Sequence, residues 1–216
     1  MNNARFTILL GGDISSTERL LSLTANTRAI AADGGMRHAQ ALSLKPELWV
    51  GDFDSADPAE FAAFSEVERQ PYPVAKAVTD GEIAVDEAIK RGAQELILVG
   101  ALGGERSDHA LQHYAYALSL AQKGFRVVLT SGVEEAYPLL PGALELDQPK
   151  DSLLSVIGFT DLHGLDIDNV EYPLDTFSLS FGSSRTVSNI AKGTVQLRLN
   201  EGKAIVLCRP YDLTGK

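Results

Sequence analysis

The stretch LWVGDFDS at residues 48–55 places an apolar run, Leu48–Val50, directly before a glycine and two aspartates. A short apolar run that ends in Gly-Asp is typical of a buried strand followed by a tight loop. The same order occurs twice earlier in the chain, at residues 6–13 and 29–35. The repetition indicates several short strands whose ends carry polar residues.

Helical patterns separate these strands. A helix is expected over Asp80–Lys90, stopped by Gly92, and another over Ser107–Gln122, stopped by Gly124. Three more are expected: one that follows a capping box at Ser15–Glu18, one that carries Met36, Ala39 and Leu42, and one that opens near Pro58. The alternation predicts an α/β fold with an open, mainly parallel sheet and helices on both faces. Ligands of such sheets bind beyond the carboxyl ends of the strands.

The second part of the chain has a different pattern. From about Val133 onward apolar and polar residues alternate, as at residues 195–199, and Asn200–Lys203 is expected to make a tight hairpin to Ala204–Cys208. This spacing predicts a smaller all-β sandwich. We therefore expect an α/β domain over residues 1–132 and a β-sandwich domain over residues 133–216.

Composition excludes several classes of protein. The 216 residues include 19 basic and 29 acidic ones, a formal charge of −10, which disfavours binding to nucleic acid or to anionic membranes. A single cysteine, Cys208, excludes an internal disulfide and a multi-cysteine metal site, and its apolar neighbours predict a core thiol. Because no signal peptide or long apolar stretch is found, a cytoplasmic protein is expected.

Common nucleotide and acyl-transfer motifs are absent from the sequence. It contains no G-x-x-x-x-G-K-[ST] phosphate loop, no G-x-G-x-x-G after the first strand and no G-x-S-x-G elbow. A nucleotide would therefore need a metal ion or a local basic clamp to bind this acidic chain.

Aspartates at the strand ends suggest such a metal site. Asp52 and Asp54 are two residues apart, so their side chains can project the same way, and a hard cation such as Mg²⁺ would relieve their repulsion. Asp80 could supply a third oxygen, and Asp33 could orient the group from the neighbouring strand. The alternative is that D-x-D followed by Ser55 is a turn with a helix cap.

A glycine-rich segment offers a phosphate site. Gly103 and Gly104 follow a strand and precede a helix, where the backbone can approach a phosphate, and Arg106 could bind its oxygens bidentately. Lys76 could neutralise further phosphate charge. The alternatives are a loop turn with a surface arginine, a solvated lysine, and Asp108 as a helix cap. Together these groups suit phosphoryl-type transfer, which depends on positioning and charge neutralisation.

The order of these motifs resembles that of the thiamine pyrophosphokinases. The motifs that carry the resemblance are Ala32–Gly35 (ADGG), Gly51–Ser55 (GDFDS), Thr79-Asp80-x-Glu82, Gly104-x-Arg106-x-Asp108-His109 and Ser188-Asn189. The likeness covers nearly the whole chain, and GDFDS is its most specific part. One departure concerns Lys76, which the family usually follows with aspartate and which Ala77 follows here.

The resemblance implies that the chain transfers the diphosphate of ATP to the hydroxyl of thiamine and releases AMP, with Mg²⁺ as cofactor. It implies that Asp52, Asp54 and Asp80 bind the metal, and that Lys76 and Arg106 act on the phosphates. The other binding positions that it implies are Asp33, Gly34, Gly35, Gly103, Gly104, Asp108, Ser188 and Asn189. It assigns ATP to the first domain and thiamine to the second, and it implies a homodimer with active sites between subunits.

Three alternative functions remain open on the sequence. A pyrophosphokinase for another alcohol, such as a hydroxymethyl pterin, would share the aspartates. A phosphatase of the haloacid dehalogenase type also uses D-x-D, although normally after the first strand. A non-catalytic sensor of thiamine or nucleotide is suggested by Ala77.

Overall fold

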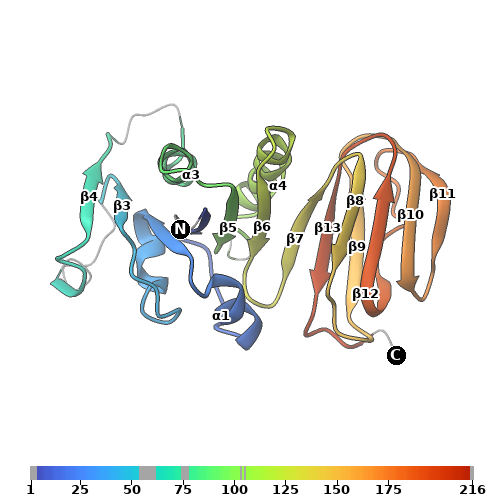
Figure 1. Ribbon diagram of the computed structural model, residues 1–216, viewed down its shortest axis with the longest axis horizontal. Helices are drawn as coiled ribbons and strands as arrows, with labels where there is room; N and C mark the ends of the chain where they lie inside the picture. The colour runs from blue at the N-terminus through green and yellow to red at the C-terminus, as the bar shows by residue number, and fades with distance from the viewer. Residues whose placement is uncertain (1–3, 54–61, 74–77, 103, 105, 215–216) are drawn as a thin grey trace. The chain divides into compact units, whose positions relative to one another are not determined.

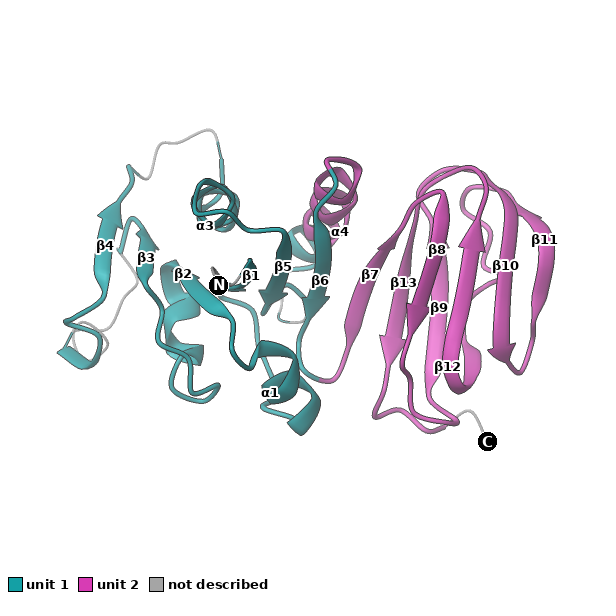
Figure 2. Cartoon of the chain, viewed as in Figure 1, with its two compact units in different colours: residues 1–110, 124–132 teal, residues 111–123, 133–216 magenta. Residues whose placement is uncertain are grey.

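The computed structural model describes residues 4–53, 62–73, 78–102, 104 and 106–214. The chain divides into two compact units, residues 1–110 with 124–132 and residues 111–123 with 133–216 (Figure 2). Paired strands are parallel in the first unit and antiparallel in the second.

A parallel sheet forms the first unit, with its strands in the order β6-β5-β1-β2-β3-β4 (Figure 1). The strands are β1 (Arg5–Leu9), β2 (Arg28–Ala32), β3 (Leu48–Gly51), β4 (Glu68–Pro71), β5 (Glu95–Val99) and β6 (Arg126–Thr130). Because all of them run the same way, their carboxyl ends lie at one edge of the sheet.

Helix α1 (Glu18–Thr24), the short 3-10 helix η1 (Asp33–His38) and helix α3 (Asp80–Lys90) pack on this sheet. Helix α4 (Ser107–Gln122) follows β5 in the chain, and most of it belongs to the second unit. Leu20 of α1 and Met36 of η1 belong to one buried cluster with Ala31, Trp49 and Ile97 of the strands. Helix α3 contacts β1, β2 and β3. These central strands are buried at nearly every position, which explains why their sequences are apolar runs and do not alternate.

Two predicted helices, α3 and α4, have the bounds expected from the sequence. The helix expected around Met36, Ala39 and Leu42 is wrong, because the segment forms η1 and turns, although all three side chains are buried as a helical face would be. Two consecutive glycines in η1 disfavour a longer α-helix. The helix expected near Pro58 starts outside the described residues.

The second unit consists of antiparallel strands (Figure 1). They are β7 (Glu135–Leu139), β8 (Gly142–Leu146), β9 (Leu153–Gly158), β10 (Leu162–Val170), β11 (Leu174–Leu179), β12 (Asn189–Leu199) and β13 (Ala204–Arg209). The start of β12 pairs with β9, and its later residues pair with β10 and β8. Side chains from both ladders form one core, among them Val156, Ile167, Leu197 and Val206. Cys208 is fully buried in that core, as predicted.

The hairpin expected at Asn200–Lys203 is wrong. Strand β9 lies between β12 and β13, so the two strands that this turn joins are not neighbours in the sheet. The turn packs instead on the start of β10, where a methyl group at Gly202 would lie 2.4 Å from the carbonyl oxygen of Asp161. Alternation fixes which face of a strand is buried, but it does not fix the partner strand.

The fold as a whole is mixed and rich in strands, with few helices in the described part of the chain. The parallel strands of the first unit agree with the α/β prediction, whereas the strand content exceeds what that prediction implied. None of the helices seen in these residues combines the length and the apolar composition that crossing a membrane requires.

Candidate active site

Two of the predicted aspartates follow adjoining strands. β2 ends immediately before Asp33, and β3 ends immediately before Asp52. The two strands pair in parallel with Ala32 opposite Val50, so the aspartates belong to neighbouring strand ends.

Backbone contacts hold Asp33 against the end of β3. The indole N–H of Trp49 donates a hydrogen bond of 2.9 Å to the carbonyl oxygen of Asp33. A methyl group at Gly51 would lie 3.2 Å from the Cα atom of Asp33, so glycine permits this close approach. Asp33 has a φ of 42°, a conformation that is unfavourable for residues other than glycine. Asp52, the residue after Gly51, therefore begins beside Asp33.

Phe53 separates Asp52 from Asp54 and also has a positive φ, 59°. Its ring meets that of Trp49 edge-on, with 5.2 Å between centroids and 87° between planes. Because Trp49 is fully buried, this packing can hold the strained conformation in place. Asp54 lies outside the described residues, so its position relative to Asp52 stays a prediction.

The loop after β1, residues 10–13, receives contacts from η1. The Nε2 atom of His38 lies 2.9 Å from the carbonyl oxygen of Gly12, and the Arg37 guanidinium donates to the carbonyl oxygen of Gly11. Burial lowers the pKa of His38, so its ring is neutral near pH 7 and Nε2 carries the proton that it donates. These contacts fix the loop, which we call the β1 loop.

Glycines after β5 approach the β1 loop closely. A methyl group at Gly100 would lie 2.5 Å from the carbonyl oxygen of Leu10 and 2.9 Å from that of Gly12. One at Gly104 would lie 3.9 Å from the backbone nitrogen of Asp13. The segment that the sequence predicted for phosphate binding therefore lies beside the β1 loop, while Gly103 itself is outside the described residues.

Asp80 also belongs to the predicted site, but it lies at the start of a helix and not at the end of a strand. It is the first residue of α3, and Thr79 caps that helix. A methyl group at Gly81 would lie 2.9 Å from Cδ2 of Leu10, so the helix begins against the β1 loop. The positive end of the helix dipole and the Asp80 carboxyl thus stand at the carboxyl edge of the sheet.

The predicted metal site is only partly described. Among the residues that the structure describes, no three acidic, histidine or cysteine side chains lie close enough to hold a metal ion. The predicted ligands are Asp52, Asp54 and Asp80, and Asp54 is not among those residues. Carboxylate oxygens suit Mg²⁺, which keeps several waters and needs few protein ligands. The ligand set therefore stays a prediction.

Arg106 pairs with Asp108 in this structure. Its Nε and Nη2 atoms donate hydrogen bonds of 2.9 Å and 2.7 Å to the two carboxylate oxygens of Asp108. Arg106 holds the pKa of Asp108 far below its usual range, so Asp108 is a carboxylate and a poor proton acceptor. Both side chains are about two-thirds exposed, at 66% and 65%. A phosphate could therefore replace Asp108 as the partner of Arg106 at little cost in free energy.

Ser188 and Asn189 lie in the second unit. Ser188 has a φ of 60°, and its backbone N–H donates to the Ser155 hydroxyl at 2.9 Å. Asn189 is 7% exposed and bonds the backbone of Tyr172. The exposed Ser188 side chain is accessible to a ligand, whereas the Asn189 side chain is mostly engaged within the chain.

Sequence reasoning missed three residues that shape the candidate site. Arg37 and His38 hold the β1 loop, and Phe53 orients the chain between the predicted metal ligands. Their types carry no motif, and only their positions two and three residues after ADGG, or within GDFDS, could have drawn attention to them. The predicted phosphate ligand Lys76, and Ala77 after it, lie outside the described residues.

Comparisons with known proteins assign a family. The family model for the thiamin pyrophosphokinase catalytic domain matches residues 20–129, which include Asp33, Asp52, Asp80 and Arg106. Thiamine pyrophosphokinase of Bacillus subtilis (strain 168) is 25% identical over 187 residues, which cover 84% of this chain and 87% of that protein.

Solved structures share the fold. The crystal structure of the Bacillus subtilis thiamine pyrophosphokinase has a TM-score of 0.84 and 23% identity, covering 95% of this chain and 98% of that one. Thiamin pyrophosphokinase from Candida albicans has a TM-score of 0.76 and 14% identity, covering 95% and 90%. With the family model matching half of the chain, these findings confirm the resemblance seen in the sequence. The chain belongs to the thiamin pyrophosphokinase family and is an enzyme of the diphosphotransferase class.

Proposed function

We propose that the chain transfers the diphosphate group of ATP to the hydroxyl group of thiamine in a Mg²⁺-dependent reaction. The observation that carries this proposal is that the start of α3 and the glycines after β5 approach the β1 loop, while Asp33 and Asp52 follow the neighbouring strands β2 and β3. The family and its named relatives support the choice of substrates.

In the proposed reaction the hydroxyl oxygen of thiamine attacks the β-phosphorus of ATP. The bond from that phosphorus to the oxygen bridging it to the α-phosphorus breaks, AMP leaves, and the hydroxyl proton passes to solvent. Bound Mg²⁺ would neutralise phosphate charge. Asp52, Asp54 and Asp80 would hold it, with Asp33 orienting them from β2.

Arg106 and Lys76 would stabilise the phosphates. For Arg106 this requires an exchange of the Asp108 carboxylate for a phosphate oxygen, an exchange between two anions with similar geometry. Because Asp108 is held as a carboxylate, it is a poor candidate for accepting the hydroxyl proton. In a loose transition state the hydroxyl proton is still largely in place, so general-base catalysis contributes little.

The finer features predicted from the sequence belong to the same proposal. They are an α/β domain over residues 1–132 with helices on both sheet faces that binds ATP and Mg²⁺, a sandwich domain over residues 133–216 that binds thiamine, a homodimer with shared active sites, and a cytoplasmic location. The packing of α1, η1 and α3 on the parallel strands supports the first of these.

The test is Asp52→Asn with Asp86→Asn as control, since Asp86 is an exposed residue of α3 outside the candidate site. We expect Asp52→Asn to lower kcat by about 100-fold or more while the circular dichroism spectrum is retained. Products of ATP, Mg²⁺ and thiamine are identified by mass spectrometry. A near-normal rate in Asp52→Asn would show that the assignment of Asp52 is wrong. Product formed from a hydroxymethyl pterin, but none from thiamine, would overturn the substrate.

A further inference from the structure

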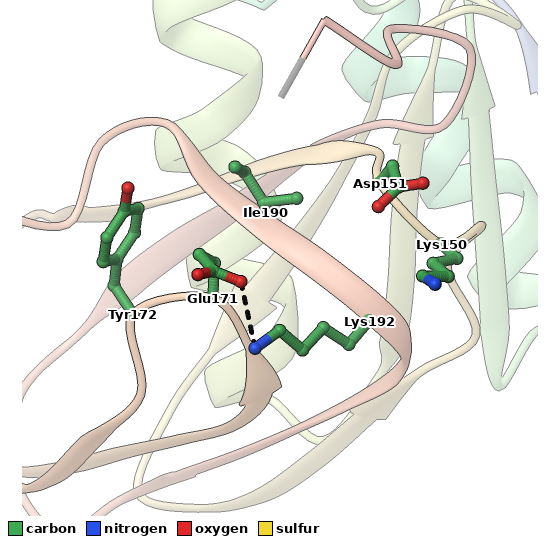
Figure 3. Close-up of a pocket in the computed structure, with 6 residues that line it drawn as sticks. All are labelled: Lys150, Asp151, Glu171, Tyr172, Ile190 and Lys192. Atoms are coloured by element: carbon green, nitrogen blue, oxygen red, sulfur yellow. Dashed lines mark ion pairs between the residues drawn. The ribbon is translucent and has the colours of Figure 1, made fainter. Parts of the chain in front are cut away.

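The second unit contains an open pocket of about 590 Å³ (Figure 3). Lys150 and Lys192 line it together with Asp151 and Glu171, and Lys192 pairs with Glu171 at 3.0 Å. Because these charges balance, the pocket favours neither an anion nor a cation. Donors that suit an anion lie instead in the first unit, in the β1 loop.

The carbonyl groups of the β1 loop are held by η1. The guanidinium of Arg37 donates to the carbonyl oxygen of Gly11, and Nε2 of His38 lies 2.9 Å from the carbonyl oxygen of Gly12. A carbonyl oxygen can only accept, so Nε2 of His38 carries a proton and donates it. His38 is 8% exposed, which limits competition from water for this hydrogen bond.

The N–H groups of the same two peptides point the other way. In a planar trans peptide the N–H is antiparallel to the C=O, so the N–H groups of Gly12 and Asp13 point away from η1. Within the described part of the chain, neither of them donates a hydrogen bond. Gly12 is partly buried and Asp13 is exposed, so a ligand can reach both donors. Successive N–H groups directed to the same side form an arrangement that binds anions.

Gly104 faces these two donors. A methyl group there would lie 3.9 Å from the backbone nitrogen of Asp13 and 3.9 Å from the Cα atom of Gly12. A larger side chain at this position would enter the space in front of the N–H groups, and glycine leaves that space open. The Asp13 carboxylate is 84% exposed and lies 3.9 Å from the Arg37 guanidinium, which offsets its negative charge.

The orientation of these peptides depends on contacts from outside the loop. Gly11 and Gly12 are adjacent glycines, whose backbone angles are the least restricted of any residue. Without the hydrogen bond from His38, the peptide between Gly12 and Asp13 could rotate, and its N–H would then turn away from Gly104. The His38 side chain therefore controls a donor on the opposite side of the loop.

We propose that His38 is a positioning residue, which with Arg37 orients the β1 loop so that the N–H groups of Gly12 and Asp13 bind the phosphate groups of a nucleotide. The inference rests on the proposed function, in which that nucleotide is ATP. It assigns the contact with substrate to the loop backbone and an indirect role to His38.

The matched pair His38→Gln and His38→Met tests the hydrogen bond. Both new side chains have the same length, but only glutamine carries a donor that can replace Nε2. We expect His38→Met to raise KM for ATP about tenfold, in line with the loss of a hydrogen bond to a charged ligand, with KM for thiamine and kcat within about threefold of the wild type. A merely structural role would lower the active fraction and leave both KM values unchanged.

Two further variants should behave as the wild type. His38→Gln restores the donor. His163→Met changes an exposed histidine of β10, in the second unit, and serves as the control for the substitution itself.

Nuclear magnetic resonance of the isotope-labelled full chain observes the donors directly. The amide proton signals of Gly12 and Asp13 are expected to move downfield when a non-hydrolysable ATP analogue and Mg²⁺ are added, because each N–H then donates to a charged oxygen. Adenosine, which has no phosphate, should leave both signals in place. In His38→Met the shift of the Asp13 signal should be smaller, since its peptide is no longer held.

Should His38→Met fail to fold, His38→Asn serves instead, because its shorter amide does not reach Gly12. An unchanged KM for ATP in the variant without the donor would overturn the inference, as would an equal rise in KM for thiamine. A loss in His38→Gln as large as that in His38→Met would also overturn it, since the ring and not the donor would then matter.

On the wild type, the inference fails when the Gly12 and Asp13 signals stay in place although the ATP analogue binds, when adenosine moves them equally, or when the analogue does not bind. The proposed function fails on a different result, the absence of thiamine diphosphate when the wild type receives ATP, Mg²⁺ and thiamine.

Discussion

At the level of single residues, packing requires glycine at position 35. A methyl group there would lie 2.1 Å from the carbonyl oxygen of Leu9 and 2.9 Å from the backbone nitrogen of Leu10. Both atoms are backbone, so neither can move aside without shifting the end of β1. The glycine that the sequence analysis assigned to ligand binding therefore also lets η1 lie against the β1 loop.

We predict that Gly35→Ala lowers the free energy of unfolding by about 1–3 kcal/mol, because the added methyl group overpacks this contact. Urea denaturation measures the change. Gly11→Ala is the matched control, since a methyl group at Gly11 would meet no atom within 4 Å. Its effect should stay within about 0.5 kcal/mol, as for other unconstrained surface positions. Equal losses in both variants would contradict the role of the Leu9 contact.

Strained backbone occurs at three positions in or beside the predicted site. Asp33, Phe53 and Ser188 all have positive φ although none is glycine, and each such residue costs about 1–3 kcal/mol. Residue type indicates this conformation only weakly at Asp33, because aspartate tolerates the left-handed region, and does not indicate it at Phe53 or Ser188. Backbone angles in the structure, rather than residue type, single these positions out.

At the level of elements, the start of α3 is set by a capping box. The N–H of Glu82 donates to the Thr79 hydroxyl at 3.2 Å, and the N–H of Thr79 donates to the Glu82 carboxylate at 3.2 Å. The motif Thr-x-x-Glu is visible in the sequence, so this boundary could be predicted. The cap also places Asp80 at the first helical position.

We predict that Thr79→Ala lowers the free energy of unfolding by about 1 kcal/mol, because a backbone N–H at the helix start loses its acceptor. Thr79→Ser keeps the hydroxyl and should stay within a few tenths of a kcal/mol. Chemical denaturation compares the three proteins. A loss in Thr79→Ser as large as that in Thr79→Ala would point to the methyl group of threonine and contradict the capping argument.

Strand β4 is an element that the local sequence pattern does not predict. Glu68–Pro71 is polar and mostly exposed, and it pairs with β3 at the edge of the sheet. An edge strand with little burial carries no apolar run, so no pattern in the sequence predicted it.

At the level of the whole molecule, ion pairs cover the edge of the parallel sheet opposite the candidate site. Arg28 donates two hydrogen bonds, of 2.9 Å and 2.7 Å, to Glu47, which also pairs with Arg91 at 3.3 Å. Arg5, at the start of β1, donates to Glu95, at the start of β5, at 2.9 Å. Ion pairs thus join the amino ends of the strands, whereas the predicted catalytic aspartates lie at the carboxyl ends.

Glu87 of α3 makes the stability of the protein depend on pH in the acid range. Lys90 donates a hydrogen bond of 2.7 Å to Glu87, and with Arg91 it lowers the pKa of the Glu87 carboxyl. A carboxyl whose pKa is lower in the folded chain stabilises the fold above its unfolded pKa of about 4.3. That contribution is lost as the pH falls through the lower, folded value.

We predict that Glu87→Gln lowers the free energy of unfolding by about 1.5 kcal/mol near pH 7, the low end for hydrogen bonds to charged groups. The difference from wild type should shrink below pH of about 4, where the wild-type carboxylate also becomes protonated. Urea denaturation between pH 3 and pH 7 measures this, with Glu145→Gln, at an exposed position of β8, as control. A difference that does not change with pH would contradict the role of the charge.

The sequence alone determined the local character of each segment: the apolar runs of β1 to β3, the aspartates after them, and the bounds of α3 and α4. These depend on neighbours a few residues apart, whose spacing fixes period, capping and burial. Only the tertiary structure decided that Gly81 meets Leu10, that β9 separates β12 from β13, and that Asn189 lies behind Tyr172. Such contacts join residues far apart in the chain, and they follow from the packing of whole elements, which no local pattern specifies.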